Sequence, residues 1–298
     1  MGQPFVVVNP RSGRGRGARV VEPLLRALEA AGASSPVAHA LTGKAGDEGR
    51  LAAEALARGF RKVVAVGGDG TWSHVASALL QADTDAALGL VPGGTGCDLA
   101  KSLGIPGDDL GGCAQIILGG RTRRIDVGRV ESRTFLNVAG FGYDVAVIED
   151  SWRVRWLSGS LLYLYCAMRQ LFRFPGFPVE LARNGEEPQR REMLMLILAN
   201  GRVFGGGFQI APQAGVDDGL LDCVAFGNMP ARRRLPLLVR LLRGTHAAAP
   251  EVQVTSGRAF RLRFAESPAY ETDGEWNRAQ SAELTVDLLP GALRVLVP

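Results

Sequence analysis

Short apolar runs that end in glycine recur along the first part of the chain. Val63–Val66 leads into Gly67-Gly68-Asp69-Gly70-Thr71, and the residues from Trp72 to Leu80 carry apolar side chains at helical spacing. A β-branched apolar run stopped by glycines predicts a buried strand and a tight turn, and the spacing after it predicts a helix. Glycines allow close approach to the backbone, and the first N–H groups of a helix attract anions. This segment is therefore suited to bind a phosphate.

Two more apolar runs end in the same way. Phe5–Val8 precedes the segment from Asn9 to Gly17, which holds three glycines and three arginines, and Ala87–Val91 precedes Pro92-Gly93-Gly94-Thr95-Gly96. Predicted helices over 20–31 and 47–58 and after Asp98 alternate with these strands and with a strand over 37–41, which indicates a parallel sheet. Ligands bind at the carboxyl ends of the strands in such sheets. We therefore expect the three glycine loops to share one edge.

Three residues that follow the predicted strands allow two interpretations each. A bare carboxylate repels phosphate, so Asp69 either contacts magnesium or water, or accepts hydrogen bonds that order the loop. Thr42, at the end of the strand over 37–41, either caps the next helix or contacts a nucleotide. Arg11 either reaches a bound phosphate or lies in a flexible, solvated loop.

The pattern changes near Ile125, after which short strands alternate with turn residues. The predicted strands cover 125–130, 134–138, 179–181, 193–198, 220–226, 252–255, 260–264 and 284–288. Such spacing predicts a mostly antiparallel β domain. Two helices, over Ser158–Phe174 and Pro230–Gly244, interrupt it. We place the boundary near Asp126, which gives an N-terminal α/β domain over 1–125 and a C-terminal β-rich domain over 126–288.

Composition and charge narrow the possible partners only slightly. The chain has 298 residues, a formal net charge of +4 and 31 arginines against three lysines. Arginine suits bidentate phosphate contact on a nucleotide, a lipid head group or a nucleic acid. The chain lacks the basic platform with interleaved aromatic residues that would favour nucleic acid. The four cysteines lack C-x-x-C spacing and the three histidines form no ligand pattern, which argues against a disulfide scaffold or a structural zinc site.

The sequence gives no sign of a secretory signal or a membrane span. The N-terminus enters a strand at once, and the most apolar later segment, over 157–168, is shorter than the roughly 20 residues that a spanning helix needs. We expect a cytoplasmic protein that is soluble or peripherally bound to a membrane.

Several motifs together resemble the diacylglycerol kinase catalytic-domain family, which includes soluble bacterial lipid kinases, sphingosine kinases and ceramide kinases. They are Asn9-Pro10 with its glycine loop, Gly67-Gly68-Asp69-Gly70-Thr71, Pro92-Gly93-Gly94-Thr95-Gly96-x-Asp98, Asp217-Asp218-Gly219 and Asp273-Gly274-Glu275. They occur in the family's order over nearly the whole chain. The central motif alone is shared with NAD kinases and, loosely, phosphofructokinases. Cys97 is a departure, because many relatives have Asn there.

The resemblance implies two domains with ATP in the cleft between them, and implies that residues from about 289 to 298 pack back on the first domain. The residues assigned to the nucleotide are Asn9, Arg11, Thr42, Gly67, Gly68, Asp69, Gly70, Thr71, Trp72, Ser73, Gly94 and Thr95. It also implies that Asp273 is the base that accepts the proton of the acceptor hydroxyl. Glu275 would position Asp273 or bind Mg²⁺, and Asp69 would complete the catalytic set. Without the resemblance, Asp273-Gly274 is equally typical of a hairpin turn.

The loop over 211–222 is a candidate magnesium site. It is typical of a simple turn, but one carboxylate with backbone carbonyls satisfies Mg²⁺, which retains several waters. By resemblance to bacterial relatives, Asp218 supplies the carboxylate, and Gly215 and Leu220 supply the carbonyls. This Mg²⁺ would be structural or regulatory and separate from the ion that ATP carries.

The predicted activity is transfer of phosphate from ATP to a lipid hydroxyl, with diacylglycerol as the first acceptor and a ceramide or sphingoid base as the second. The apolar stripe over 158–174 either lines an acyl groove or belongs to the core. Arg232, Arg233 and Arg234 either dock the helix over 230–244 on an anionic membrane or form a solvated face. A kinase for a soluble acceptor, as NAD kinases are, and a non-catalytic nucleotide- or lipid-binding regulator are the alternatives. The oligomeric state, including a homodimer, stays open.

Overall fold

The structure is a computed structural model that describes residues 2–44, 46–82, 84–157 and 159–298. The chain forms two compact units. Unit 1 consists of Met1–Val127, Val216–Asp218 and Pro290–Pro298, and unit 2 consists of Gly128–Gly215 and Gly219–Leu289. Ser158, with which the sequence begins a predicted helix, lies outside the described residues. None of the helices in the described ranges is long and apolar enough to cross a membrane.

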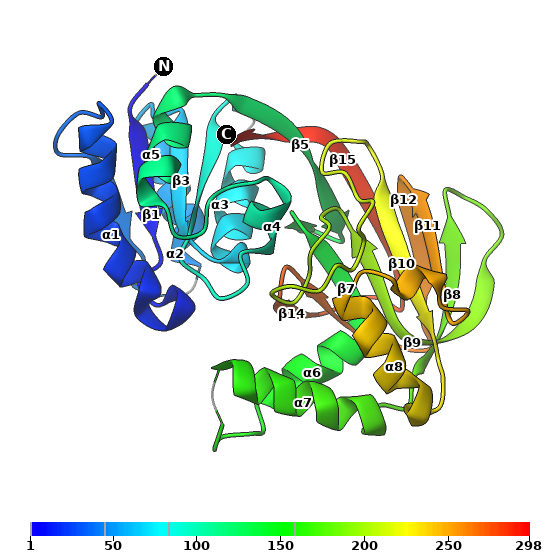
Figure 1. Ribbon diagram of the computed structural model, residues 1–298. Helices are drawn as coiled ribbons and strands as arrows, with labels where there is room; N and C mark the ends of the chain where they lie inside the picture. The colour runs from blue at the N-terminus through cyan, green and yellow to red at the C-terminus, as the bar shows by residue number, and fades with distance from the viewer. Residues whose placement is uncertain (1, 45, 83, 158) are drawn as a thin grey trace. The chain divides into compact units, whose positions relative to one another are not determined.

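Unit 1 alternates strands and helices. Its elements are β1 (Pro4–Val8), α1 (Ser12–Ala30), β2 (Ala38–Leu41), α2 (Asp47–Ala57), β3 (Lys62–Gly67), α3 (Asp69–Gln81), β4 (Ala87–Pro92), α4 (Asp98–Ser102) and α5 (Leu110–Gly119). The strands pair in parallel in the order β2-β1-β3-β4, and the end of β15 (Glu283–Leu296) adds in parallel to β4. Helix α1 packs with α5, and α2 packs with α3, on opposite faces of the sheet (Figure 1).

Burial explains why the strands of unit 1 are uniformly apolar. Every residue of β1, β3 and β4 is buried. A parallel sheet that is covered by helices on both faces needs apolar side chains on both, so its strands do not alternate. The predicted strands and the helices over 47–58 and 72–80 are confirmed. The segment after Asn9 is not simply a loop, because α1 begins at Ser12 and only Gly13, Arg14 and Gly15 leave the helical path, at φ of 53°, 57° and 83°.

Unit 2 is an antiparallel β structure with three α-helices in the described ranges. Its elements are β6 (Arg133–Phe135), β7 (Val138–Gly142), α6 (Tyr143–Ser151), α7 (Gly159–Arg173), β8 (Phe177–Arg183), β9 (Gln189–Ala199), β10 (Leu221–Gly227), α8 (Ala231–Leu242), the short 3-10 helix η1 (His246–Ala248), β11 (Val252–Gly257), β12 (Ala259–Arg263), β13 (Ala269–Thr272), β14 (Glu275–Arg278) and the first part of β15, while β5 (Thr122–Val130) enters from unit 1. The order β14-β13-β7-β9-β8-β12-β15 forms the main path, and β10 and β11 extend from β9.

Strand β9 separates two apolar cores. Leu196 and Leu198 face the core that contains Phe141 and Tyr270, whereas Met195 and Ile197 face the core that contains α8. Successive side chains of a strand point to opposite faces. The continuous apolar run Met193–Ala199 follows from burial on both sides. The α/β and β-rich organisation that the sequence predicts is confirmed.

Candidate active site

The carboxyl ends of β1 and β3 lie at the point where the strand order of unit 1 reverses. From β1 the chain passes to β2 on one side, and it then returns to β3 on the other side. In open α/β sheets, ligands bind in the crevice outside such a switch point. Asn9 follows β1 and Gly67 ends β3, so two of the three predicted loops begin there.

The three glycine loops of unit 1 touch one another. A Cβ on Gly13 would lie 2.3 Å from the carbonyl oxygen of Gly93, and a Cβ on Gly94 would lie 2.5 Å from the Cα of Gly68. The backbone N–H groups of Gly93 and Gly94 both donate to the carbonyl of Gly67, at 2.7 and 2.9 Å. Side chains larger than hydrogen would force these loops apart. The expectation that the loops share one edge is confirmed.

Asn9 links three elements through its side chain. Its Nδ2 donates to Glu48 Oε1 in α2 at 3.0 Å and to Thr71 Oγ1 in α3 at 3.1 Å. Its Oδ1 accepts the N–H of Arg11 at 3.0 Å. Asn9 and the buried Thr71 therefore hold the loop in shape, and Arg11 itself is exposed on it.

Asp69 orders the neighbouring loop. Its two carboxylate oxygens accept the N–H groups of Asp98, at 3.3 Å, and Leu99, at 3.2 Å, at the start of α4. Burial, and then the nearby charge of Asp98, raise the pKa of Asp69. Of the two interpretations of Asp69, the geometry matches the one in which its carboxylate accepts hydrogen bonds that order the loop.

Cys97 lies at the junction between the third glycine loop and α4. Its φ of 53° and ψ of 44° are left-handed, a conformation that glycine and asparagine adopt most easily. Its Sγ lies 3.7 Å from the carbonyl oxygen of Gly67, and burial raises its pKa to about 11. The side chain is therefore a neutral thiol that packs against the β3–α3 turn.

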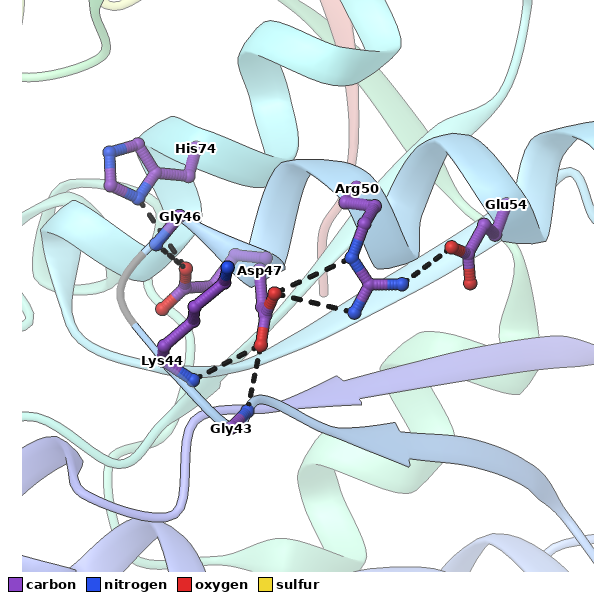
Figure 2. Close-up of polar contacts among 8 residues, drawn as sticks. Gly43, Lys44, Gly46, Asp47, Arg50, Glu54 and His74 are labelled. Atoms are coloured by element: carbon purple, nitrogen blue, oxygen red, sulfur yellow. Dashed lines mark hydrogen bonds and ion pairs between the residues drawn. The ribbon is translucent and has the colours of Figure 1, made fainter.

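The loop after β2 is built by two acidic residues of α2 (Figure 2). The Asp47 carboxylate accepts the N–H groups of Gly43, at 2.9 Å, and Lys44, at 3.1 Å, which lower its pKa. Glu48 accepts the N–H of Gly46 at 3.0 Å. Burial raises the pKa of Glu48, but hydrogen bonds, led by that of His74, outweigh this and lower it.

Thr42 does not cap α2. The residue at the N-terminal boundary of that helix is Gly46, and the N–H of Thr42 donates to the carbonyl of Val8 at 2.8 Å. The capping interpretation is therefore wrong, because Asp47 already organises the preceding amides. The nucleotide-contact interpretation of Thr42 stays a prediction.

The expected contact of the Trp72 side chain with the nucleotide also needs correction. Its side chain is fully buried and its Nε1 donates to the carbonyl of Ala65 at 3.1 Å. The indole therefore packs in the core beneath the turn and has no exposed surface for a nucleotide contact. Ser73 is also buried, whereas Gly70 is half-buried and Thr95 is exposed on the third loop.

Asp273 lies in the hairpin between β13 and β14 of unit 2. Its φ is 50° and its side chain is buried. The carboxylate accepts three successive backbone N–H groups, from Leu136 at 2.7 Å, Asn137 at 2.9 Å and Val138 at 3.1 Å. These bonds also explain why the predicted strand over 134–138 divides into β6 and β7, since its amides donate to a side chain instead of a strand.

The carboxyl groups of Asp144 and Glu271 lie close together beside this turn. A Cβ on Gly140 would lie 1.8 Å from Asp144 Oδ2 and 2.7 Å from Glu271 Oε1, so the two oxygens flank the same point. Glu271 Oε2 accepts the N–H of Gly274 at 2.6 Å, whereas Glu275 is half-buried. Burial raises the pKa of Asp144 to about 7. Sequence reasoning missed this pair, since its only signal was an acidic residue two positions before the D-G-E motif.

The structure does not test the predicted magnesium loop. Asp217 forms an ion pair with Arg123, both in unit 1, and Leu220 is partly exposed. Within the described residues, no cluster of three or more His, Cys, Asp or Glu side chains has a geometry suited to a metal ion. A site with one carboxylate from Asp218 and the carbonyls of Gly215 and Leu220 stays a prediction.

The structure separates the three arginines at the start of α8. Arg232 and Arg233 are exposed, but Arg234 is buried. Its guanidinium donates to the carbonyls of Met229, Leu171 and Phe174 and to the side chain of Asn228, at 2.8–3.1 Å. Arg234 therefore joins α8 to the end of α7, and its assignment to a membrane surface is wrong.

Two family models together cover most of the chain. The model of the diacylglycerol kinase catalytic domain matches residues 3–130. The model of the YegS C-terminal NAD kinase beta sandwich-like domain matches residues 137–297.

Individual relatives are similar over nearly the same length. A diacylglycerol kinase of Mycobacterium tuberculosis is 31% identical over 303 residues, with 100% of this chain and 96% of the relative covered. A Pseudomonas putida protein named as a probable YegS-like lipid kinase is 35% identical over 265 residues, with 87% and 84% covered. A crystal structure of a Bacillus anthracis diacylglycerol kinase has a TM-score of 0.76 at 19% identity, with 99% and 97% covered, and shows a common fold.

Proposed function

Because the chain belongs to the diacylglycerol kinase catalytic-domain family, we propose that it is a phosphotransferase that moves the γ-phosphate of ATP to a lipid hydroxyl. Diacylglycerol is the first acceptor, because the Mycobacterium tuberculosis relative of matching length carries that name. The observation that carries the proposal is the contact among the three glycine loops of unit 1, in which Gly13, Gly68 and Gly94 let backbone approach backbone at the turn.

These loops fit the phosphates of ATP. The first N–H groups of α3, at Asp69 and Gly70, start a helix whose dipole favours an anion, and they follow directly on the Gly67-Gly68 turn. Gly94 lies against Gly68 of the same turn, and Thr95 follows it in the chain. When bound, Mg²⁺ neutralises charge on the transferred phosphate. The Mg²⁺ that ATP carries needs few protein ligands, and the Asp218 loop is the proposed place for a separate ion.

We assign the role of base to Asp273. Three backbone N–H groups hold its carboxylate in one position, so a base at this place would be oriented before the acceptor binds. In the proposed step the acceptor oxygen bonds to the γ-phosphorus, the bond from that phosphorus to the bridging oxygen of ATP breaks, and the hydroxyl proton passes to Asp273. Glu275, two residues further, is the residue that positions Asp273 or binds Mg²⁺.

A labelled-ATP transfer assay over diacylglycerol, ceramide, sphingosine, monoacylglycerol, polyprenol and NAD tests the activity. We expect label in diacylglycerol. Label in ceramide or sphingosine alone would reassign the acceptor within lipids, and label in NAD alone would exclude a lipid kinase. The absence of transfer to every acceptor, with ATP still bound, would support a regulator that has lost turnover.

The variants Asp273→Asn and Glu275→Gln test the base. Proton transfer by a positioned side chain contributes about 10²–10⁴-fold to a rate. We expect Asp273→Asn to lose at least about 100-fold in kcat while ATP affinity is kept, and Glu275→Gln to lose less. Because an amide nitrogen cannot accept the N–H of Leu136, a urea unfolding curve of each variant must accompany the kinetics. Undiminished turnover in folded Asp273→Asn would remove Asp273 as the base.

A further inference from the structure

Helix α7 exposes large apolar side chains along one face. Leu161, Leu164 and Phe172 are 66%, 58% and 57% exposed. Their spacing, together with the exposed Tyr165 and the half-buried Met168, places them on one side of the helix. Cys166 on the other side is fully buried. The helix is therefore apolar on two opposite sides.

The inner side of α7 has a partner within unit 2. Cys166 packs in a small core with Val147 of α6 and Val154, and the Tyr143 hydroxyl donates to the carbonyl of Ala167 at 2.7 Å. Figure 1 shows α6 and α7 side by side. Packing of the helix onto its own unit therefore accounts for the inner side and leaves the outer side unexplained.

Trp156, in the segment before α7, extends the exposed apolar side of the helix. Trp156 is 72% exposed, and its ring lies 5.3 Å from that of Tyr165 in an edge arrangement. We call Trp156, Leu161, Leu164, Tyr165 and Phe172 the α7 face. A contiguous apolar surface of this kind marks an interaction site, and Trp and Tyr are enriched where a protein meets the membrane–water interface.

The two segments of the chain that contain the α7 face and α8 carry basic residues and no acidic ones. Residues 151–179 contain four arginines and no Asp or Glu, and residues 223–250 contain five arginines and no Asp or Glu. Arg153, Arg155 and Arg173 are exposed. In the second segment Arg232, Arg240 and Arg243 are exposed on and after α8, which Arg234 joins to the end of α7. An anionic surface complements both segments.

We propose that the α7 face inserts shallowly into an anionic lipid bilayer, with the exposed arginines of these two segments at the level of the head groups. The proposal deepens the proposed function, since a lipid acceptor lies in a membrane, but vesicle binding can be measured without turnover. Apolar insertion supplies affinity that is independent of charge, and the arginines supply selectivity for anionic lipid. The surface thus adds the α7 face to the exposed arginines of α8 and leaves out the buried Arg234.

Flotation with vesicles tests the proposal. We expect the wild-type protein to float with vesicles that contain phosphatidylglycerol and to float weakly with phosphatidylcholine alone. Burial of each leucine side chain in the bilayer contributes to affinity, so the double variant Leu161→Ser/Leu164→Ser should bind at least tenfold more weakly. The matched control is Val254→Ser in β11, a residue that is 42% exposed in the same unit. It should bind as the wild type does.

Two further measurements separate the components of the surface. Arg155→Glu/Arg173→Glu, which reverses two of the exposed charges, should reduce the preference for phosphatidylglycerol. The fluorescence of the wild type should shift to shorter wavelength on vesicle binding, and Trp156→Phe should lose most of this shift. An unchanged shift in Trp156→Phe would contradict insertion of the α7 face.

The outcomes distinguish this proposal from the proposed activity. If the wild type does not float, or if the serine variant floats as well as Val254→Ser, the α7 face is not a membrane surface. If sedimentation shows that the wild type is a dimer and the serine variant a monomer, the face is instead an interface between two copies. Vesicle binding without transfer to any lipid would overturn the kinase and leave the docking surface in place. Loss of flotation with unchanged turnover on a short-chain, water-soluble diacylglycerol would support the surface and the kinase together.

Discussion

At the scale of single residues, several carboxylates in the described part of the chain hold loops in place. Asp69 accepts two N–H groups of α4, Asp47 accepts two of the loop before α2, and Asp273 accepts three of the β6–β7 segment. Hydrogen bonds to a charged acceptor contribute more than neutral ones. The position of each loop therefore depends on one acidic side chain.

Asp144 gives a prediction about pH. Burial raises its pKa to about 7, whereas in the unfolded chain it titrates near 4. Between these values the folded state keeps a proton that the unfolded state has lost, so the folded state loses stability as pH rises. Asn cannot lose a proton. We expect Asp144→Asn to gain roughly 2–4 kcal/mol in unfolding free energy relative to the wild type between about pH 4 and pH 7.

Urea unfolding of both proteins across this pH range measures the difference. Val254→Ser, which changes an exposed side chain that does not titrate, is the control and should give a difference that does not change with pH. A flat difference for Asp144→Asn as well would show that Asp144 is ionised in the folded protein.

At the scale of elements, the periodicity of apolar residues predicted the helices and strands that lie fully within one unit and have a strong apolar pattern. Helices α2, α3, α7 and α8 match the predictions to within a few residues. Helices α5 and α6 were missed, as was the strand pair β13–β14 around the Asp273 turn. Residues 143–151 of α6 carry buried acidic side chains, Asp144 and Asp150, on the side that faces the protein. A helix that buries charge lacks the apolar stripe on which the prediction depends.

Arg234 gives a prediction about the attachment of α8. Its guanidinium serves three backbone carbonyls and one side chain, all within unit 2. Removal of the donors leaves these buried carbonyls without hydrogen bonds, at about 1–3 kcal/mol each. We expect Arg234→Met to lower the free energy of unfolding by at least about 3 kcal/mol.

The urea unfolding midpoint is the measurement, and two other variants complete it. Arg232→Met removes an exposed arginine two residues away and should change stability by less than about 0.5 kcal/mol. Arg234→Lys should recover only part of the loss, because an ammonium lacks the planar fork. Equal midpoints for the Met variants would show that Arg234 is dispensable for the attachment.

At the scale of the whole molecule, the chain contributes distant segments to unit 1. Its last residues return to the first domain of the sequence, where Arg294 and Val295 pair with Ala87 and Leu88 of β4. The N–H of Gly291 donates to Asp126 at 2.7 Å, and that of Val297 donates to Arg121 at 3.1 Å. The C-terminal segment is thus an integral strand of the parallel sheet.

Removal of residues 290–298 should therefore destabilise unit 1. The deletion exposes the edge of β4 and removes Leu293, Val295 and Leu296, which are all buried. At about 1.5–3 kcal/mol for each side chain, we expect a loss of roughly 5 kcal/mol and a tendency to aggregate through the open edge. Differential scanning calorimetry and light scattering measure both effects. An unchanged melting temperature in the truncated protein would contradict this role of the segment.

The sequence by itself determined the two-domain organisation, the parallel sheet with its three glycine turns and the family, because these depend on local backbone preferences and on motifs in a fixed order. Only the tertiary structure decided what Asp69, Asp273 and Arg234 contact. The first two bind amides that are 29 to 137 residues away, and local patterns carry no information about such partners. Arg234 resembles its neighbours Arg232 and Arg233 in sequence, and only the packing of α8 against α7 shows which of the three is buried. The packing of α7 likewise decides which of its apolar side chains are buried and which form the exposed α7 face.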